Sequence, residues 1–495
     1  MSERRAFALV FLASGSVLVL EILAGRLLAP FVGVTLETFT GIIGVVLAGI
    51  ALGTWQGGRL ADRLDPARTV PLLLAAGGAL AIAAVPLIRV LGDAGLGHGA
   101  FAIVTLAMLG FFLPSAVLSA VSPMIVKLRL RSVDHTGSVV GQLSAVGTFG
   151  SLVGVFLTGF VFVARFAITP VIVGLGVTLV VVGAALTLDR ARTRGHHDTE
   201  RLMGCAALAV CATALTVTVP SPCAEDTTYY CARVETDPAR PTGRVLYLDD
   251  QSHSYVDLAD PTYLGFSYAQ SMSDVIAAMS PDGAALDTVH IGGGGFTLPR
   301  YLGATHPGST SLVLEVDPGV VDLDERELGL TPFDGLTIRT GDARVLLRDV
   351  PDASTDLVIG DAFGGETVPW HLTTREFVTE VARVLRPDGI YALNIIDGSA
   401  MRFAGAELAT LRAVFGNVAV LAPADRIDHL AGGNLVLVAS PRPLPLDPMV
   451  GHVAERGDTD IVLGSDAGID RFIAGAQVLT DDFAPVDRLH TPADT

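Results

Sequence analysis

The hydrophobic residues of this chain follow two different patterns, and the change falls near residue 220. In the N-terminal part, long apolar runs are separated by short polar stretches. A helix needs about 20 mostly apolar residues to cross the roughly 30 Å hydrocarbon core of a bilayer. The pattern therefore predicts about seven membrane-spanning helices, at Ala6–Leu28, Phe39–Trp55, Val70–Val90, Ala100–Val126, Gly141–Val163, Phe166–Leu188 and Leu202–Val219.

In the C-terminal part the apolar runs are short and alternate between the periods of strands and helices. Strands are predicted at Leu286–Ile291, Ser311–Glu315, Leu336–Arg339, Thr355–Ile359 and Ile390–Ile396. Helical periods lie between them, for example at Thr374–Leu385 and Ala404–Phe415. This alternation predicts an α/β domain of the Rossmann type, in which helices cover both faces of a parallel sheet.

These patterns divide the chain into predicted domains. We expect an all-α transmembrane bundle over residues 1–220, a linker over 221–242, a Rossmann-like domain over 243–445 and a C-terminal extension over 446–495. Charge changes at the same place. Up to Val219 there are 15 Lys and Arg against 10 Asp and Glu, and from Pro220 onward there are 18 against 41. Two parts of opposite net charge and different hydropathy suit different solvents.

The acidity of the C-terminal part bears on its partners. Acidic residues repel the phosphates of nucleic acid, so no nucleic-acid partner is expected. The same charge suits a cationic ligand, although acidic side chains more often serve only to keep a surface solvated.

The charges flanking the apolar runs predict how the chain crosses the bilayer. Basic residues gather at alternate ends of the runs, at Arg4, Arg5, Arg59, Arg63, Arg68, Lys127, Arg129, Arg190 and Arg201. Loops rich in Lys and Arg remain in the cytoplasm. We therefore expect a multi-pass protein of the cell membrane with a cytoplasmic N-terminus and, after seven spans, an extracytoplasmic C-terminal domain. One span more or fewer would reverse the side of that domain.

Two of the four cysteines carry information about the compartment. Cys223 and Cys231 bracket a short polar stretch directly after the last apolar run, and in an oxidising compartment they are expected to form a disulfide. No further Cys or clustered His accompanies them, so no metal site is expected. Arg26 lies inside the first predicted span, where an ionisable group is costly and usually faces a partner.

The candidate chemistry collects at the ends of the predicted strands. Gly292–Gly295 follow the first strand and let the backbone approach a ligand. Glu315 ends the next strand, where an acid typically binds ribose hydroxyls. Gly341-Asp342-Ala343 end the third strand and Asp361 the fourth. A glycine loop followed by acids at three strand ends predicts an adenosine-containing ligand. Because no GxGxxG is present and acids surround the loop, cationic S-adenosylmethionine or a relative fits better than a dinucleotide.

Several motifs in this part resemble those of spermidine synthases, and more closely those of the membrane-fused spermidine synthase-like family. The matching stretches are IGGGGFTLPRYL, VLEVDPGVV, RTGDAR, DLVIGDAF, HLTTREF and VLRPDGIYALNI, within about Gly243 to Ser440. SPCAEDTTYYC and LTDDFAPVD also resemble the fused proteins. The resemblance implies a polyamine aminopropyltransferase domain with an N-terminal transmembrane bundle.

The resemblance also implies roles for single residues. The donor would be decarboxylated S-adenosylmethionine, with its ribose on Glu315, its adenine amino group on Asp342 beside Ala343, and its tail along Gly292, Gly293 and Gly294. Asp361 would assist deprotonation of the attacking amine, and Tyr268 would belong to the substrate-binding stretch. Spermidine synthases are commonly dimers, so a homodimer is implied as well.

The sequence departs from the family on the polyamine side. The family's GGGDGG reads GGGGFT here, its DSSDP reads DAFGG, and the His of its YHE is Ala269. Three functions therefore remain open. The first is a membrane-bound aminopropyltransferase acting on a polyamine or other small amine. The second is a methyltransferase that uses ordinary S-adenosylmethionine, and the third is a non-catalytic polyamine sensor or transporter.

Overall fold

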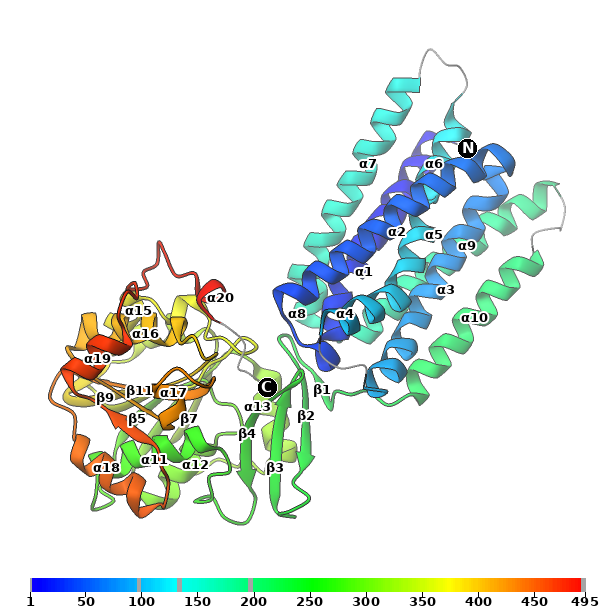
Figure 1. Ribbon diagram of the computed structural model, residues 1–495. Coiled ribbons are helices and arrows are strands. Elements are labelled where there is room, and N and C mark those ends of the chain that lie inside the picture. Colours follow the sequence, from blue (N-terminus) through cyan, green and yellow to red (C-terminus); the bar gives the residue numbers. More distant parts are fainter. Residues whose placement is uncertain (1, 96–98, 131–135, 195–198, 491–495) are drawn as a thin grey trace. The chain divides into compact units, whose positions relative to one another are not determined.

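The computed structural model describes residues 2–490 except 96–98, 131–135 and 195–198, and it separates into two compact units (Figure 1). Unit 1 comprises Met1–Ala232 and Leu248–Asp250, and unit 2 comprises Arg233–Tyr247 and Gln251–Thr495. Residues 221–242, expected as a linker, contain two strands. These are β1 (Glu225–Asp226) and β2 (Cys231–Thr236), which form a four-stranded sheet with β3 (Gly243–Leu248) and β4 (Gln251–Asp257) in the order β1-β2-β3-β4.

Unit 1 is helical. Its elements are α1 (Glu3–Val32), α2 (Leu36–Arg63), α3 (Pro66–Asp93), α4 (Ala100–Ala107), the π-helix η1 (Met108–Phe112), α5 (Leu113–Ser119), α6 (Val121–Arg129), α7 (Thr136–Leu157), the π-helix η3 (Thr158–Phe162), α8 (Val163–Arg165), α9 (Ile168–Arg194) and α10 (Thr199–Thr218). Over the described residues, α4 to α6 join into one long apolar segment and α7 to α8 into another, so that seven segments are long and apolar enough to cross a membrane. The predicted number of apolar helices is confirmed.

Most predicted apolar runs lie within longer helices, but the sixth begins before its helix. The run was expected to begin at Phe166, and α9 begins at Ile168. Phe166 has extended backbone angles (φ −137°, ψ 140°) and ends the preceding helical segment. An apolar side chain contributes to a hydropathy run whether or not its backbone is helical, so the pattern alone does not locate this turn.

The helices of unit 1 approach one another through glycines. A Cβ on Gly15 of α1 would lie 2.8 Å from the carbonyl oxygen of Gly150 in α7, and a Cβ on Gly154 would lie 2.6 Å from that of Gly15. On α2, a Cβ on Gly53 would lie 2.1 Å from the carbonyl oxygen of Ala116. These glycines are therefore packing surfaces, as expected for helices that associate in lipid through small residues.

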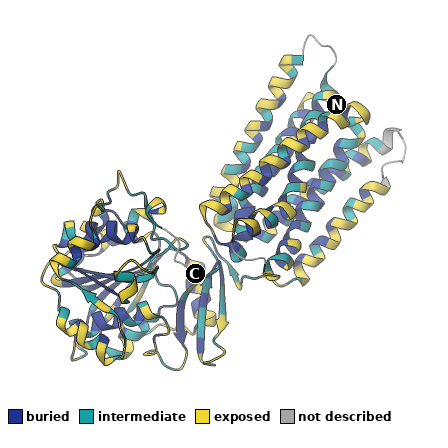
Figure 2. Cartoon of the chain, in the orientation of Figure 1, coloured by how far each residue is buried: buried dark blue, intermediate teal, exposed yellow. Residues whose placement is uncertain are grey.

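The helices of unit 1 leave many residues exposed (Figure 2). Among them, the large apolar residues Leu36, Phe101 and Val217 are exposed over 82%, 79% and 83% of their surface, and further large apolar residues are exposed along α2, α4 and α10. A water-soluble protein rarely exposes so continuous an apolar surface, because its contact with water is unfavourable.

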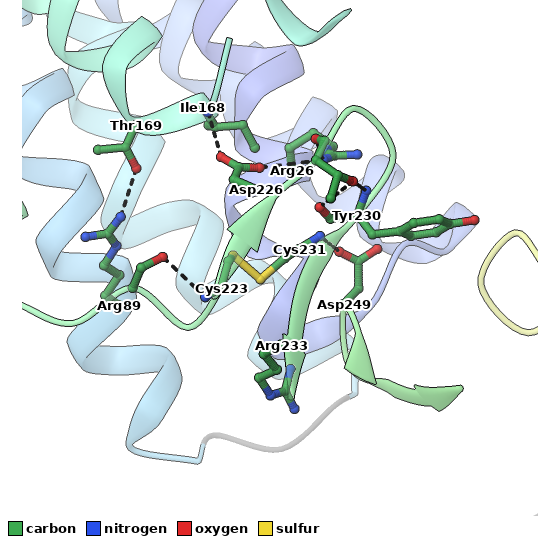
Figure 3. The surroundings of a disulfide bond; sticks show 12 residues. Arg26, Arg89, Ile168, Thr169, Cys223, Asp226, Tyr230, Cys231, Arg233 and Asp249 are labelled. Atoms are coloured by element: carbon green, nitrogen blue, oxygen red, sulfur yellow. Dashed lines mark hydrogen bonds and ion pairs between the residues drawn. A yellow bond between two sulfur atoms is a disulfide. The ribbon is translucent and has the colours of Figure 1, made fainter. Parts of the chain in front are cut away.

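The predicted disulfide is present, and the loop that it closes is anchored to two helices (Figure 3). Cys223 and Cys231 are bonded, and between them the carbonyls of Thr227, Thr228 and Tyr229 accept hydrogen bonds from the Arg26 guanidinium of α1. Asp226 accepts a 2.7 Å hydrogen bond from the backbone N–H of Ile168, the first residue of α9. Arg26 thus has the partners that an arginine in an apolar segment requires.

Unit 2 is built on an eight-stranded sheet in the order β12-β10-β11-β9-β8-β5-β6-β7. Its strands are β5 (Asp287–Ile291), β6 (Thr310–Glu315), β7 (Leu336–Thr340), β8 (Thr355–Gly360), β9 (Leu385–Asp397), β10 (Asn417–Ala422), β11 (Gly433–Ser440) and β12 (Ile461–Leu463). The five strands from β7 to β9 are parallel, as predicted, but β11, β10 and β12 pair antiparallel. A wholly parallel sheet was therefore wrong, and the correction is a mixed sheet with an antiparallel edge, a common form of such folds.

Helices cover both faces of this sheet, as predicted (Figure 1). They are α11 (Ser267–Met279), α12 (Thr297–Thr305), α13 (Pro318–Glu327), α14 (Ala343–Leu346), α15 (Arg375–Val384), α16 (Arg402–Phe415), α17 (Ala424–Ile427), α18 (Leu446–Glu455), α19 (Asp466–Phe472) and α20 (Val486–Leu489), with 3-10 turns at η4 (Leu347–Asp349) and η5 (Trp370–Leu372). Alternate residues of β8 enter two cores: Val358 packs with α15 and α16, and Leu357 and Ile359 pack with α11 and α18. The period of two along a strand produces this division.

Glu407 on α16 is fully buried, and neither of its carboxyl oxygens has a hydrogen-bond partner within the described residues. Burial raises its pKa well above the ordinary value. The folded protein keeps this proton while the unfolded chain loses it above about pH 4.3, so stability is expected to fall by up to about 1.4 kcal/mol per pH unit above that value. Glu407→Gln should leave stability unchanged at pH 4 and raise it increasingly toward pH 7.

Thermal unfolding of the full-length protein in detergent, followed between pH 4 and 8, measures this effect. Glu327→Gln, on an exposed position of α13, is the matched control and should change nothing. An equal change in melting temperature at all pH values would contradict the buried, protonated state of Glu407.

Candidate functional site

The carboxyl ends of the parallel strands are joined to one another by backbone hydrogen bonds. The N–H of Asp361, after β8, donates to the carbonyl of Ile291 in β5 at 2.9 Å. The N–H of Gly292 donates to Leu314 of β6 at 3.0 Å, and that of Gly341, after β7, to Glu315 at 2.8 Å. The predicted site residues at four strand ends therefore line one edge of the sheet, where ligands of such folds bind.

The glycine loop is shaped by the strand beside it. Gly292 has φ +93°, and a Cβ there would lie 2.4 Å from the carbonyl oxygen of Asp361. Only glycine adopts this conformation easily, and only glycine leaves room for the neighbouring strand end. Gly294 also has a positive φ, and the N–H of Gly295 donates to the Ser254 hydroxyl at 3.0 Å. The loop is thus fixed from β8 on one side and from β4 on the other.

Glu315 lies under this loop. Its carboxylate accepts hydrogen bonds from the N–H of Gly293 at 2.7 Å and of Asp317 at 2.9 Å. Burial raises the pKa of Glu315, while these backbone donors act in the opposite direction. Each carboxylate oxygen has a further lone pair, so the group remains able to accept from a pair of hydroxyls on a ligand.

Asp342 and Ala343 stand at the next strand end. Asp342 caps α14 by accepting the N–H of Arg344 at 2.8 Å, and its other oxygen lies 3.4 Å from Nε2 of His371. Ala343 is buried at the start of α14. Asp342 is exposed and therefore accessible to a ligand, although it also has the local role of capping a helix.

Asp361 is the most strongly perturbed acid at this edge. Oδ1 accepts a 2.9 Å hydrogen bond from the side-chain amide of Asn394 in β9, and the Tyr268 hydroxyl of α11 also hydrogen-bonds to the carboxylate. Burial raises the pKa of Asp361 to about 6, against the effect of these two donors. A carboxyl group with such a pKa is ionised at neutral pH and can still accept a proton, as a general base must.

Aromatic side chains lie near Asp361. The Tyr268 hydroxyl, which hydrogen-bonds to Asp361, also lies 3.4 Å from the carbonyl oxygen of His253. The His253 ring meets Phe363 edge-on, with 6.5 Å between ring centres. Burial lowers the pKa of His253 to about 4, so this ring is neutral at pH 7. Asp361 is therefore the charged group among these side chains.

Other acids near the predicted motifs have structural roles. Asp481, in the LTDDFAPVD stretch, forms two hydrogen bonds to Arg344, at 2.8 and 2.6 Å, and accepts a third from Thr374. Asp397 accepts the N–H groups of Phe403 and Ala404 at the start of α16. Within the described residues no group of three or more His, Cys, Asp or Glu is arranged to hold a metal ion.

The structure therefore brings Tyr268, Asp361 and Gly292 together, and it places Glu315 against Gly293 of the same loop. Asn394 was not predicted as a site residue, yet it is 2% exposed and donates to Asp361. A signal was present, because Asn394 is the one polar residue within the run Ile390–Ile396. A polar side chain in a buried strand needs a partner, and here the partner belongs to the candidate site.

Glu315 permits a direct test of ligand binding. If its carboxylate accepts the ribose hydroxyls, Glu315→Ala should weaken adenosyl-donor binding by about 1–3 kcal/mol, because ligand hydroxyls lose a buried partner. Calorimetric titration of the full-length protein measures this change. Glu325→Ala, on the exposed side of α13, is the matched control. An unchanged dissociation constant for Glu315→Ala would remove Glu315 from the ligand site.

Comparison with known proteins gives partial matches. No family model matches the chain. A polyamine aminopropyltransferase of Vibrio vulnificus is 36% identical over 128 residues, which are 26% of this chain and 42% of that relative. A polyamine aminopropyltransferase of Chromobacterium violaceum is 27% identical over 192 residues, or 36% of this chain and 72% of that relative. The chain thus spans less than half the length of the first of these relatives.

Two solved structures are similar to part of the chain. A probable spermidine synthase from Corynebacterium glutamicum is 27% identical with a TM-score of 0.48, covering 52% of this chain and 95% of that one. A spermidine synthase from Thermotoga maritima is 16% identical with a TM-score of 0.34, covering 53% and 81%. Each of these similarities extends over about half of this chain.

Proposed function

We propose that this chain is a membrane-bound transferase of the spermidine synthase type. It binds an adenosyl-sulfonium donor, decarboxylated S-adenosylmethionine, at the ends of β5, β6 and β7, and moves the aminopropyl group to the nitrogen of a polyamine or other small amine. The observation that carries the proposal is Asp361, a half-buried carboxylate with a pKa of about 6 that lies against Gly292 of the glycine loop, whose next residue donates to Glu315. The similarity to polyamine aminopropyltransferases supports it.

The proposed reaction is a single displacement. The amine nitrogen attacks the propyl carbon bonded to the sulfonium, the C–N bond forms as the C–S bond breaks, and the electron pair of that bond passes to sulfur. The products are the aminopropylated amine and neutral methylthioadenosine. A protonated amine is no nucleophile, so a base must remove its proton, and Asp361 is the group for that step. Glu315 and the glycine loop hold the donor for in-line attack.

A binding and turnover measurement tests the proposal. The full-length protein in detergent is titrated with decarboxylated S-adenosylmethionine, ordinary S-adenosylmethionine and methylthioadenosine, and methylthioadenosine release is followed with a panel of amines. We expect tighter binding of the decarboxylated donor and amine-dependent release of methylthioadenosine. No binding of any of the three would overturn the proposal.

A second candidate is methyl transfer from ordinary S-adenosylmethionine. It is favoured by the glycine loop, in which a Cβ on Gly295 would lie 2.9 Å from Cγ2 of Val256 and 3.1 Å from Cβ of Ser254. The position therefore has no room for an acidic side chain that would attract an aminopropyl ammonium or repel a donor carboxylate. Preferential binding of ordinary S-adenosylmethionine, with release of S-adenosylhomocysteine, would select this candidate.

We place the seven apolar helices in the cell membrane, with the N-terminus in the cytoplasm and the acidic unit outside it. The apolar outer surface of unit 1 supports insertion, and the disulfide supports an oxidising compartment for the loop between Cys223 and Cys231. After reduction with an impermeant phosphine, an impermeant maleimide should label these two cysteines in intact cells. Cys223→Ser with Cys231→Ser should abolish the labelling, and labelling only after lysis would place unit 2 in the cytoplasm.

A further inference from the structure

Asp361 is connected to a second asparagine on the neighbouring strand. Asn394 in β9 donates its side-chain amide to Oδ1 of Asp361 at 2.9 Å, and its side-chain carbonyl accepts the amide of Asn434 in β11 at 3.1 Å. In the antiparallel β9–β11 pair, Asn394 lies opposite Val436 and Asn434 opposite Ile396. The two asparagines are therefore diagonal neighbours on one face of the sheet, close enough for their side chains to meet.

The direction of these hydrogen bonds follows from the chemistry of Asp361. An ionised carboxylate only accepts, so Asn394 must turn its NH₂ group toward Asp361 and its oxygen away from it. That oxygen then needs a donor, and Asn434 supplies one. With the amide of Asn394 reversed, its oxygen would face the carboxylate and its NH₂ would face the NH₂ of Asn434. While Asn434 keeps its NH₂ directed at Asn394, both contacts would be repulsive, so Asn434 in this orientation favours the ionised form of Asp361.

The backbone of Asn434 is itself held by the side chain of Arg426. Nη1 of Arg426 donates to the carbonyl oxygen of Asn434 at 2.6 Å. The same guanidinium lies against Gly433, where a Cβ would come within 2.7 Å of its central carbon. The first residues of β11 are thereby fixed in place, and the side chain of Asn434 projects from a defined position.

We propose that Asn434 is a positioning residue for the reaction: acting through Asn394, it holds the Asp361 carboxylate ionised and oriented to take a proton from the acceptor amine. This inference rests on the proposed function, but its first consequence concerns Asp361 alone. Without the donor from Asn434, Asn394 is free to reverse, and the proton of Asp361 is then held more firmly. We expect the titration midpoint of Asp361 to rise by about one pH unit, as for a carboxylate that loses part of its hydrogen bonding.

The test is a direct titration of Asp361 in the full-length protein in detergent. Infrared spectra of each protein are recorded across the pH range, and the spectra of Asp361→Asn are subtracted from them. The carboxylic-acid band that remains reports protonated Asp361. The midpoint is compared in wild type, Asn434→Leu, Asn394→Leu and the double variant. Asn434→Ala serves the same purpose if Leu prevents folding, and Asn434→Gln, which keeps the amide donor, should restore much of the wild-type value. Asn417→Leu, in β10, is the matched control.

The expected result is an upward shift in Asn434→Leu that disappears when Asn394 is already Leu, because the effect passes through Asn394. An unchanged midpoint with a lowered melting temperature would overturn the proposal and leave Asn434 a structural residue. If Asn434→Leu shifted the midpoint equally in wild type and in Asn394→Leu, the proposal would be overturned as well. Turnover is measured separately to distinguish the two hypotheses. A shifted Asp361 midpoint in a protein that consumes no donor contradicts only the proposed function. Turnover in a protein whose midpoint does not shift contradicts only the role of Asn434.

Discussion

Asp361→Asn is expected to lower the rate of group transfer by about 10²–10⁴-fold, the usual contribution of a positioned general base. The substitution keeps the size of the side chain but removes its ability to take a proton. Donor binding should change little, because in the proposed site Glu315 and the glycine loop hold the adenosine part. Single-turnover release of methylthioadenosine gives the rate, and calorimetry gives the dissociation constant of the donor.

The pH dependence gives the same prediction a second readout. Burial raises the pKa of Asp361 to about 6, so the base form is lost as the pH falls through 6. The transfer rate should therefore fall about tenfold per pH unit below that value and level off above it. Asp361→Asn should lack this acid limb. Asp482→Asn, an exposed control, should keep both rate and limb. An Asp361→Asn protein with the full rate would exclude Asp361 as the base.

Gly292→Ala is expected to destabilise unit 2 by about 2–5 kcal/mol. Two effects add: a non-glycine residue at positive φ costs about 1–2 kcal/mol, and an overpacked atom costs about 1–3 kcal/mol. The new Cβ would lie 2.4 Å from the carbonyl oxygen of Asp361, so the ends of β5 and β8 would have to separate. Because this contact joins the glycine loop to Asp361 in the proposed site, we expect donor binding to weaken together with the melting temperature.

Gly364→Ala is the matched control in the same region. A Cβ there would meet only ordinary contacts, the nearest being Cγ of Pro369 at 3.9 Å. Its effect on stability should stay within about 0.5 kcal/mol, as at other exposed positions. Thermal unfolding of the two variants in detergent, compared with wild type, measures the difference. Equal melting temperatures for Gly292→Ala and wild type would show that the strand ends yield without cost.

Much of this protein is determined by local sequence. Apolar runs of the length of a bilayer predict the seven helices of unit 1, because hydropathy and helix length do not depend on distant contacts. Short apolar runs that end in Gly292, Glu315, Asp342 and Asp361 predict the strands and the edge at which they meet, because parallel strands present their carboxyl ends together. The Cys223–Cys231 bond followed from two cysteines close in sequence just after the last apolar run, since the other two cysteines of the chain lie within that run.

Only the tertiary structure decided how the groups at this edge act on one another. The antiparallel edge strands were not predicted, because strand direction depends on connections and not on local periodicity. Asn394 and Asn434 are 40 residues apart and meet only because β9 pairs with β11 in one register. The perturbed pKa of Asp361 has the same origin: burial and hydrogen-bond donors are supplied by elements distant in sequence. A sequence places each chemical group on its element, and packing alone sets the distances that give the group its chemistry.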